Sequence, residues 1–127
     1  MKQPFALLVA AATLSFSAYA SAEKPWDGTY TAYKGHYILY SNDLDEKQAP
    51  TRDDRKIALM VEGPMAKEMF ESIGPDLKAA CGASARLRIR EKGDVECTYD
   101  KETPSSPYTC RFGLNLRTGK SIPGSTC

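Results

Sequence analysis

The stretch "ARLRIREKGDVECTYD" (85–100) decides the fold, because two runs of alternating apolar and polar residues flank the turn sequence Glu91-Lys92-Gly93. Alternation with a period of two is typical of a half-buried β-strand. Glycine readily adopts the left-handed conformation that a three-residue hairpin loop needs at its last position. We therefore predict an antiparallel hairpin that turns at residues 91–93.

The charges of this hairpin favour one register. A three-residue loop places Arg88 opposite Glu96 and Arg90 opposite Asp94, so oppositely charged pairs share an outward face. A two-residue turn at Lys92-Gly93 would instead place Arg90 beside Val95 and mix charged and apolar side chains on the same face. In the favoured register the inward face is apolar and consists of Leu87, Ile89, Val95 and Cys97.

A second hairpin follows when Cys97 is placed opposite Cys110. The polar, proline-bearing segment 100–107 then serves as its loop. The further pairs in this register are Tyr99–Tyr108 on the inner face and Glu96–Arg111 and Thr98–Thr109 on the outer face. The two hairpins together predict a three-stranded meander.

The first half of the chain predicts further strands and one helix. Segment 28–41 is rich in tyrosine and threonine and predicts a strand or a pair of strands around Gly35, and 56–63 predicts another strand. Gly63-Pro64 begins a helix, whose apolar residues recur at helical spacing as far as Ala80. Gly74-Pro75 interrupts this pattern, so we expect one kinked helix or two short ones. The predicted class is α+β: an antiparallel sheet of N-terminal strands and the C-terminal meander, packed against one kinked helix and tied by two disulfides.

The N-terminus has the pattern of a secretory signal peptide. One lysine precedes the apolar run "FALLVAAATLSF", and small residues suited to cleavage follow at Ala20 and Ala22. We expect residues 1–22 to be removed and residues 23–127 to form a single small domain in the periplasm or outside the cell. That domain has 16 basic and 16 acidic residues, which argues against nucleic-acid binding. No segment is apolar for long enough to predict a membrane span.

The four cysteines, an even number in an exported chain, predict two disulfides. Their wide spacing argues against a zinc site, which needs close pairs. The hairpin register predicts Cys97–Cys110, and this leaves Cys81–Cys127 as the second bridge. The alternative pairing is Cys81–Cys97 with Cys110–Cys127.

Motifs for catalysis or cofactor binding are weak. The sequence T-G-K-S (118–121) is not a phosphate-binding loop, because five residues instead of four separate Gly113 from Gly119 and no helix can follow. His36 is the sole histidine and has no nucleophile motif beside it. We therefore predict no catalytic, cofactor or metal residues, and a protein that is not an enzyme.

The candidate partner-binding residues are exposed charges and one tyrosine. Arg86 and Arg117 have no evident acidic partner in the predicted hairpins, and the outer sheet face and the charged loop 42–56 are the candidate surfaces. The full set is Arg86, Arg117, Asp43, Asp45 and Tyr37. The sequence leaves the oligomeric state open.

The function expected by elimination is binding of another periplasmic protein by surface complementarity. Inhibition of a cell-wall hydrolase or immunity against an antibacterial toxin would suit the size and the disulfides. One alternative is a small hydrolase that uses His36 or the carboxylates of residues 43–54. Another is a ligand-binding module whose contacts come from the N-terminal tyrosines Tyr30, Tyr33, Tyr37 and Tyr40.

Overall fold

The structure of the chain is a computed structural model that describes residues 25–126. The chain divides into an N-terminal part that ends at Tyr30 and a compact unit that begins at Thr31. The predicted signal peptide, residues 1–22, and Cys127 lie outside the described residues.

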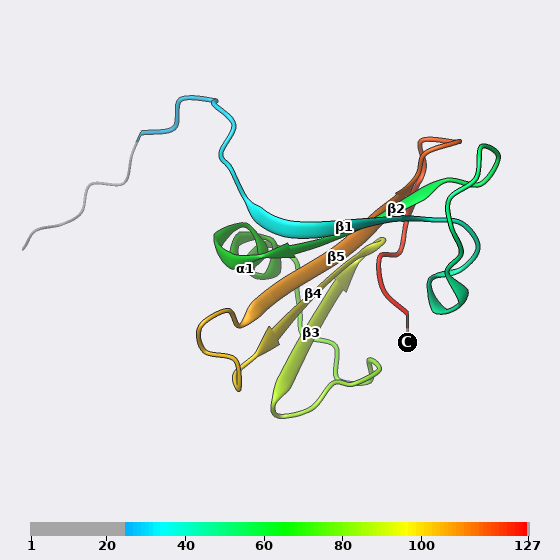
Figure 1. Ribbon diagram of the computed structural model, residues 1–127. Coiled ribbons are helices and arrows are strands. Elements are labelled where there is room, and N and C mark those ends of the chain that lie inside the picture. The colour runs from blue at the N-terminus through cyan, green and yellow to red at the C-terminus, as the bar shows by residue number, and fades with distance from the viewer. Residues whose placement is uncertain (1–24, 127) are drawn as a thin grey trace, which may run out of the picture. The chain divides into compact units, whose positions relative to one another are not determined.

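The compact unit contains a six-stranded antiparallel sheet with one α-helix packed against it (Figure 1). The strands lie in the order β1-β2-β5-β4-β3, and β6 pairs with β5 beyond the end of β4. The elements are β1 (Lys34–Tyr40), a 3-10 turn (Leu44–Glu46), β2 (Lys56–Glu62), α1 (Gly63–Ser72), β3 (Leu87–Lys92), β4 (Val95–Asp100), β5 (Tyr108–Asn115) and β6 (Ser121–Ile122). The predicted α+β class and the sheet of N-terminal strands with a C-terminal meander are confirmed.

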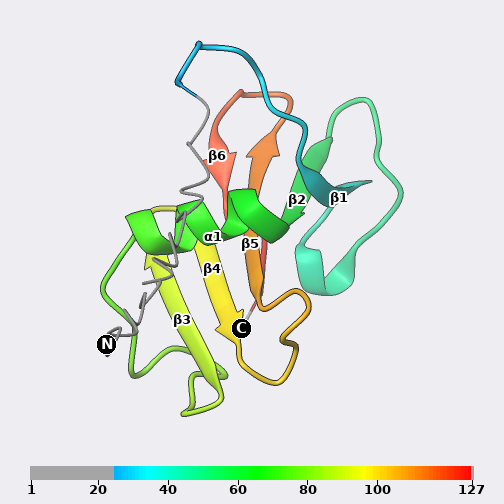
Figure 2. The ribbon, with the colours of Figure 1, turned by 90° about the vertical axis from the view of Figure 1, so that its left-hand side faces the viewer.

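The helix α1 covers one side of the sheet. It crosses in front of β4 and β5 in Figure 2, and its Ala66 and Phe70 are buried against Val61, Cys97 and Cys110. These five residues form the core, and the apolar periodicity of α1 and β2 brings them together. We call this side of the sheet the helix face and the opposite side the open face.

The helix is shorter than predicted and has no kink. It ends at Ser72, and the chain from 73 to 86 runs as irregular backbone. Proline cannot donate a helical hydrogen bond and restricts the residue before it, so Gly74-Pro75 ends the helix where a kink was expected. The segment that follows lies beside β3, where the Leu77 N–H donates to the Ile89 carbonyl at 2.8 Å.

The predicted register of the second hairpin is confirmed. Cys97 lies opposite Cys110, and Tyr99 opposite Tyr108. The two cysteines form a buried disulfide. This is the one disulfide found among the described residues, where two were expected. The predicted bridge from Cys81 ends at Cys127, which lies outside the described residues, so it stays a prediction.

The predicted register of the first hairpin is wrong. Leu87 lies opposite Asp100 and Arg90 opposite Cys97, a shift of three residues. The turn is made by two residues, and Gly93, with φ 58°, stands at its first central position, which glycine takes in type II′ turns. An odd shift moves every side chain of β3 to the other face of the sheet.

This shift places Arg88 and Arg90 on the helix face and buries Ile89 on the open face. The guanidinium carbon of Arg90 lies 4.2 Å from the centre of the Phe70 ring, and that of Arg88 lies 5.3 Å from it. Asp76 accepts hydrogen bonds from both arginines. Arg88 and Arg90, which were expected to face outward, therefore pack over the aromatic core.

Candidate functional site

The two edge strands of the sheet are protected to different degrees. Beside β3, the chain that follows α1 donates from the Leu77 N–H to the Ile89 carbonyl and from the Ser84 N–H to the Leu87 carbonyl. Beside β1, the strand β2 occupies one side, and no described strand pairs with the other. An edge strand presents a row of backbone donors and acceptors that another chain can use. The edge at β1 is therefore open along a seven-residue strand within residues 25–126, whereas β6, which pairs with β5 alone, has two residues.

The side chains of β1 add apolar surface to this open edge. Tyr37 is 69% exposed on the helix face, beyond the cover of α1, and Ile38 is 44% exposed on the open face. Gly35 lets the strand approach β2 closely, because a Cβ at this position would lie 2.6 Å from the Met60 carbonyl oxygen. Aromatic and β-branched residues favour strand formation. The sequence therefore builds a regular strand whose apolar side chains remain exposed.

A hollow of about 270 Å³ lies on the open face beside this edge. Its apolar floor is formed by Ile38 of β1 and by Ala58 and Met60 of β2. Three basic side chains stand around that floor: His36, Lys47 and Arg111. We call this feature the β1 hollow. Its combination of apolar floor and basic rim suits a group that is apolar at one end and anionic at the other.

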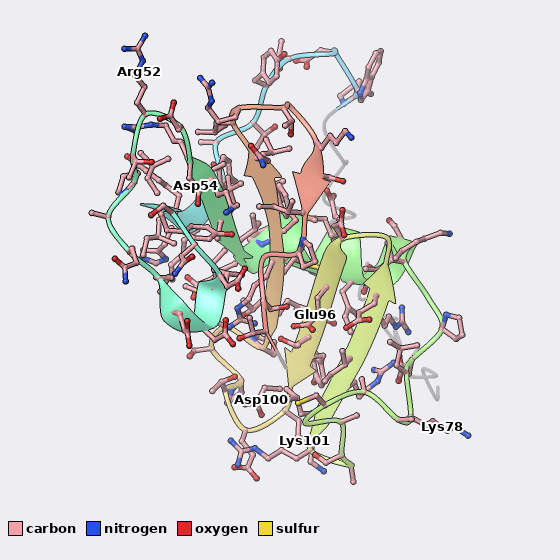
Figure 3. All side chains as sticks on the ribbon, turned by 90° about the vertical axis from the view of Figure 1, so that its right-hand side faces the viewer. Arg52, Asp54, Lys78, Glu96, Asp100 and Lys101 are labelled. Carbon is pink, nitrogen blue, oxygen red and sulfur yellow. A yellow bond between two sulfur atoms is a disulfide. The ribbon has the colours of Figure 1, made fainter. Side chains whose placement is uncertain are left out.

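The loop between β1 and β2 is held by a compact polar network. The Lys56 ammonium lies 2.8 Å from Asp54 and donates to the Asn42 carbonyl at 2.9 Å. The hydrogen bond from Lys56 lowers the pKa of Asp54, and burial raises the pKa of Tyr40 beside them. Figure 3 shows Asp54 in this loop. This network fixes the start of β2 relative to the end of β1.

The structure separates the predicted binding residues into two groups. Tyr37 lies in β1, and Asp43 and Asp45 line a cavity of about 360 Å³ between the loop and the C-terminal segment. Arg117 lies in the turn after β5, near the same loop, because the Leu116 N–H donates to the Arg55 carbonyl. These four residues belong to the β1 side of the sheet or to the loops at its end.

Arg86 lies at the opposite end of the sheet, just before β3. Its guanidinium lies 3.4 Å from Asp100 and 3.2 Å from Glu102. The expectation that Arg86 has no acidic partner was therefore wrong. The error comes from the register of the first hairpin, since Asp100 reaches the start of β3 only in the observed pairing.

The residues of the hydrolase alternative lie apart. His36 lines the β1 hollow, whereas Asp43 and Asp45 line the other cavity, and Asp54 is bound to Lys56 and Asn42. Within residues 25–126, no three histidine, cysteine or acidic side chains are grouped to hold a metal ion.

The tyrosines do not share a face. Tyr40 is buried at 2% exposure and lies on the open face, whereas Tyr37 points to the helix face. Tyr30 belongs to the separate N-terminal part. A single tyrosine-lined surface is therefore not formed by the residues that the sequence suggested for it.

Sequence analysis missed one pair of carboxyl groups. Glu91 and Glu96 lie opposite each other on the open face, and Glu96 is near the centre of the sheet in Figure 3. Burial raises the pKa of Glu96, with Glu91 acting in the same direction and a hydrogen bond from Ser125 and the charge of Arg111 opposing it. A carboxyl with a raised pKa beside a second one can hold a proton between them. The wrong hairpin register, which put Arg88 opposite Glu96, concealed this pair.

The longest helix in the part of the chain that the structure describes is the ten-residue α1, and none there has the length and apolar character needed to cross a membrane. Comparisons of the chain with protein-family models, with curated proteins and with solved structures gave no match.

Proposed function

We propose that this chain is a small exported binding protein that recognises another periplasmic protein by surface complementarity, with β1 at the centre of its docking surface. Inhibition of a cell-wall hydrolase, or immunity against an antibacterial toxin, is the kind of role such a protein would have. The observation that carries the proposal is the contrast between the two edges of the sheet. The edge at β3 is covered by the chain's own backbone, and the edge at β1 is exposed.

The mode of recognition would be addition of an extended partner segment to β1. Main-chain hydrogen bonds supply affinity in such complexes, and side chains on alternate faces supply specificity. On β1 those alternate contacts are Tyr37 on the helix face and Ile38 on the open face. The loop with Asp43 and Asp45 follows β1 directly and would form a charged rim around the contact.

The composition of β1 supports a binding role for this edge. Proteins that avoid edge-to-edge association place lysine, proline or a bulge in their edge strands. β1 has one lysine, Lys34 at its first position, and the following six residues contain neither proline nor a further lysine. An edge left open in this way favours pairing with another chain.

The test is capture of partners from periplasmic extract with the mature chain, followed by hydrogen exchange on the complex. We expect the backbone amides of β1 to become protected when the partner binds. The double variant Tyr37→Lys and Ile38→Lys should lose the partner, because lysines on both faces oppose strand addition.

The control is Met65→Lys, which places one lysine at an exposed apolar position of α1 and is compared with the double variant and with Ile38→Lys alone. The Met65→Lys variant should capture the partner as the wild type does. Protection that maps to α1 or to residues 73–86 would contradict the proposal, as would equal capture by the double variant.

A further inference from the structure

The β1 hollow is lined by apolar and basic residues. Its floor, formed by Ile38, Ala58 and Met60, is apolar, and Leu44 of the 3-10 turn closes one side. None of the ten residues that line it is acidic, whereas the basic residues His36, Lys47 and Arg111 all belong to it. The cavity at the loop differs in this respect, because Asp43 and Asp45 line it.

The two permanent cations of the hollow are Lys47 and Arg111, and the charge of Arg111 also acts on Glu96, which lies opposite it in β4. The Lys47 ammonium donates to the Leu44 carbonyl at 2.7 Å, which holds it beside the hollow and leaves its other N–H groups unused by that bond. Arg111 stands on the open face between Met60 and Glu96. Among residues 25–126, neither cation has a carboxylate within ion-pair distance.

We propose that the β1 hollow binds a small molecule with an apolar body and a carboxylate. The apolar body lies over Ile38, Ala58 and Met60, and the carboxylate accepts hydrogen bonds from Arg111 and Lys47. A guanidinium matches a carboxylate with two parallel hydrogen bonds. This site shares Ile38 with the proposed docking surface, but a small molecule can be tested on it without the protein partner.

The size of the hollow limits the ligand. Sites for drug-sized molecules have volumes of roughly 300–1,000 Å³. At about 270 Å³, the β1 hollow suits a smaller molecule, of the size of a short aliphatic or aromatic acid. The basic rim would repel an amine of the same shape and would give an alcohol of the same shape no ionic contact.

The experiment compares three probes that share one apolar chain: hexanoate, hexanol and hexylammonium. Each is titrated into the isotope-labelled mature chain while the backbone amide shifts are followed by nuclear magnetic resonance. We expect hexanoate to give saturable shifts in β1 and β2 around Ile38, Ala58 and Met60. It should bind about tenfold more tightly than hexanol, because hydrogen bonds to charged groups are stronger than neutral ones. Hexylammonium should give no saturable shift.

The variant Arg111→Gln should weaken hexanoate binding by about tenfold and leave hexanol binding unchanged. Lys67→Gln on α1 removes the same charge from the other side of the sheet and should have no effect. If Arg111→Gln unfolds, Lys47→Gln in the exposed loop makes the same comparison. The proposal is overturned if the three probes bind equally, if the shifts lie elsewhere, or if hexanoate binds the folded rim variant as tightly as the wild type.

Discussion

Arg90 illustrates how a charged residue becomes part of the core. Its guanidinium lies over the Phe70 ring, donates to Asp76 at 2.6 Å and donates to the Phe70 carbonyl at 2.8 Å. The long side chain covers apolar surface while its charged end keeps hydrogen-bond partners. Arg88 repeats the arrangement on the same carboxylate. Asp76 thus joins the chain that follows α1 to the strand β3.

We predict that the substitution Arg90→Lys lowers the unfolding free energy of the domain by on the order of 1–2 kcal/mol. Lysine cannot cover the ring as a plane or donate to Asp76 and to the Phe70 carbonyl in the same fixed geometry. Urea unfolding measures the change. The control Arg86→Lys alters an exposed pair and should change the unfolding free energy by less than about 1 kcal/mol. Equal effects of the two variants would contradict the structural role of Arg90.

The stability of the domain should depend on pH through Asp76. Hydrogen bonds from Arg88 and Arg90 lower the pKa of Asp76 from 3.8 to about 2. A carboxyl whose pKa is lower in the folded state stabilises the fold above its unfolded pKa, and this stabilisation is lost as the pH falls through its folded pKa. The stability difference between wild type and Asp76→Asn should therefore be full above about pH 4 and shrink towards pH 2.

Thermal unfolding of both proteins from pH 7 to pH 2 measures this difference. Asp53→Asn changes an exposed carboxylate in the loop before β2 and serves as the control. A difference between wild type and Asp76→Asn that stays constant down to pH 2 would show that the Asp76 charge contributes nothing.

Among the elements, the strands β4 and β5 form the centre of the fold. They carry the disulfide, and Tyr99 and Tyr108 pack against Phe70 of α1, with ring centres 6.3 and 5.5 Å away. The two tyrosine rings lie 5.0 Å apart. Aromatic pairs at such separations add to the stabilisation that burial gives. The disulfide thus joins β4 to β5 covalently, and aromatic packing holds this hairpin against the helix that covers it.

We predict that the double variant Cys97→Ala and Cys110→Ala lowers the free energy of unfolding by about 3 kcal/mol. The bridge spans a sequence separation of 13 residues and removes conformational freedom from the unfolded chain. Replacing both residues avoids leaving one reactive thiol. Urea unfolding of the variant and of the oxidised wild type gives the difference, and a loss well below 1 kcal/mol would mean that packing alone sets the register.

The molecule as a whole is asymmetric, because the two faces and the two end strands of its sheet differ in what covers them. One face of the sheet carries α1, and the open face carries the β1 hollow and the carboxyl pair of Glu91 and Glu96. One edge is covered and the other is exposed. β1, the β1 hollow and the loop at 42–55 therefore lie together at the exposed edge of the sheet.

We predict that two disulfides join distant parts of the chain. Non-reducing peptide mapping of the protein should find Cys97 joined to Cys110 and Cys81 joined to Cys127. The second bridge would close a loop of 47 residues and contribute on the order of 4 kcal/mol by chain entropy. A peptide that joins Cys81 to Cys97 would contradict both bridges. If the signal peptide is removed, the most N-terminal peptide in the same digest should begin at Ser21 or Glu23.

Local pattern in the sequence was sufficient for part of this fold. Alternation predicts the strands, Gly63-Pro64 predicts the start of α1, and the pair Cys97 and Cys110 sets the register of β4 and β5. Each of these depends on neighbours within one element or one hairpin. For the candidate site, the sequence singled out Tyr37, Asp43 and Asp45 as binding candidates, but it did not indicate the β1 hollow, which Tyr37 lines and the two aspartates do not.

Tertiary structure decided what depended on distant partners. The predicted register of β3 was based on charge pairs and was wrong, because such pairs contribute only about 0.2–1 kcal/mol each. Asp76 and Phe70, 14 and 20 residues before Arg90 in sequence, give this arginine its partners on the helix face. The β1 hollow joins residues from β1, β2, β5 and the loop. Only the folded chain brings such groups together, because their contacts depend on how the sheet and helix pack and not on local spacing.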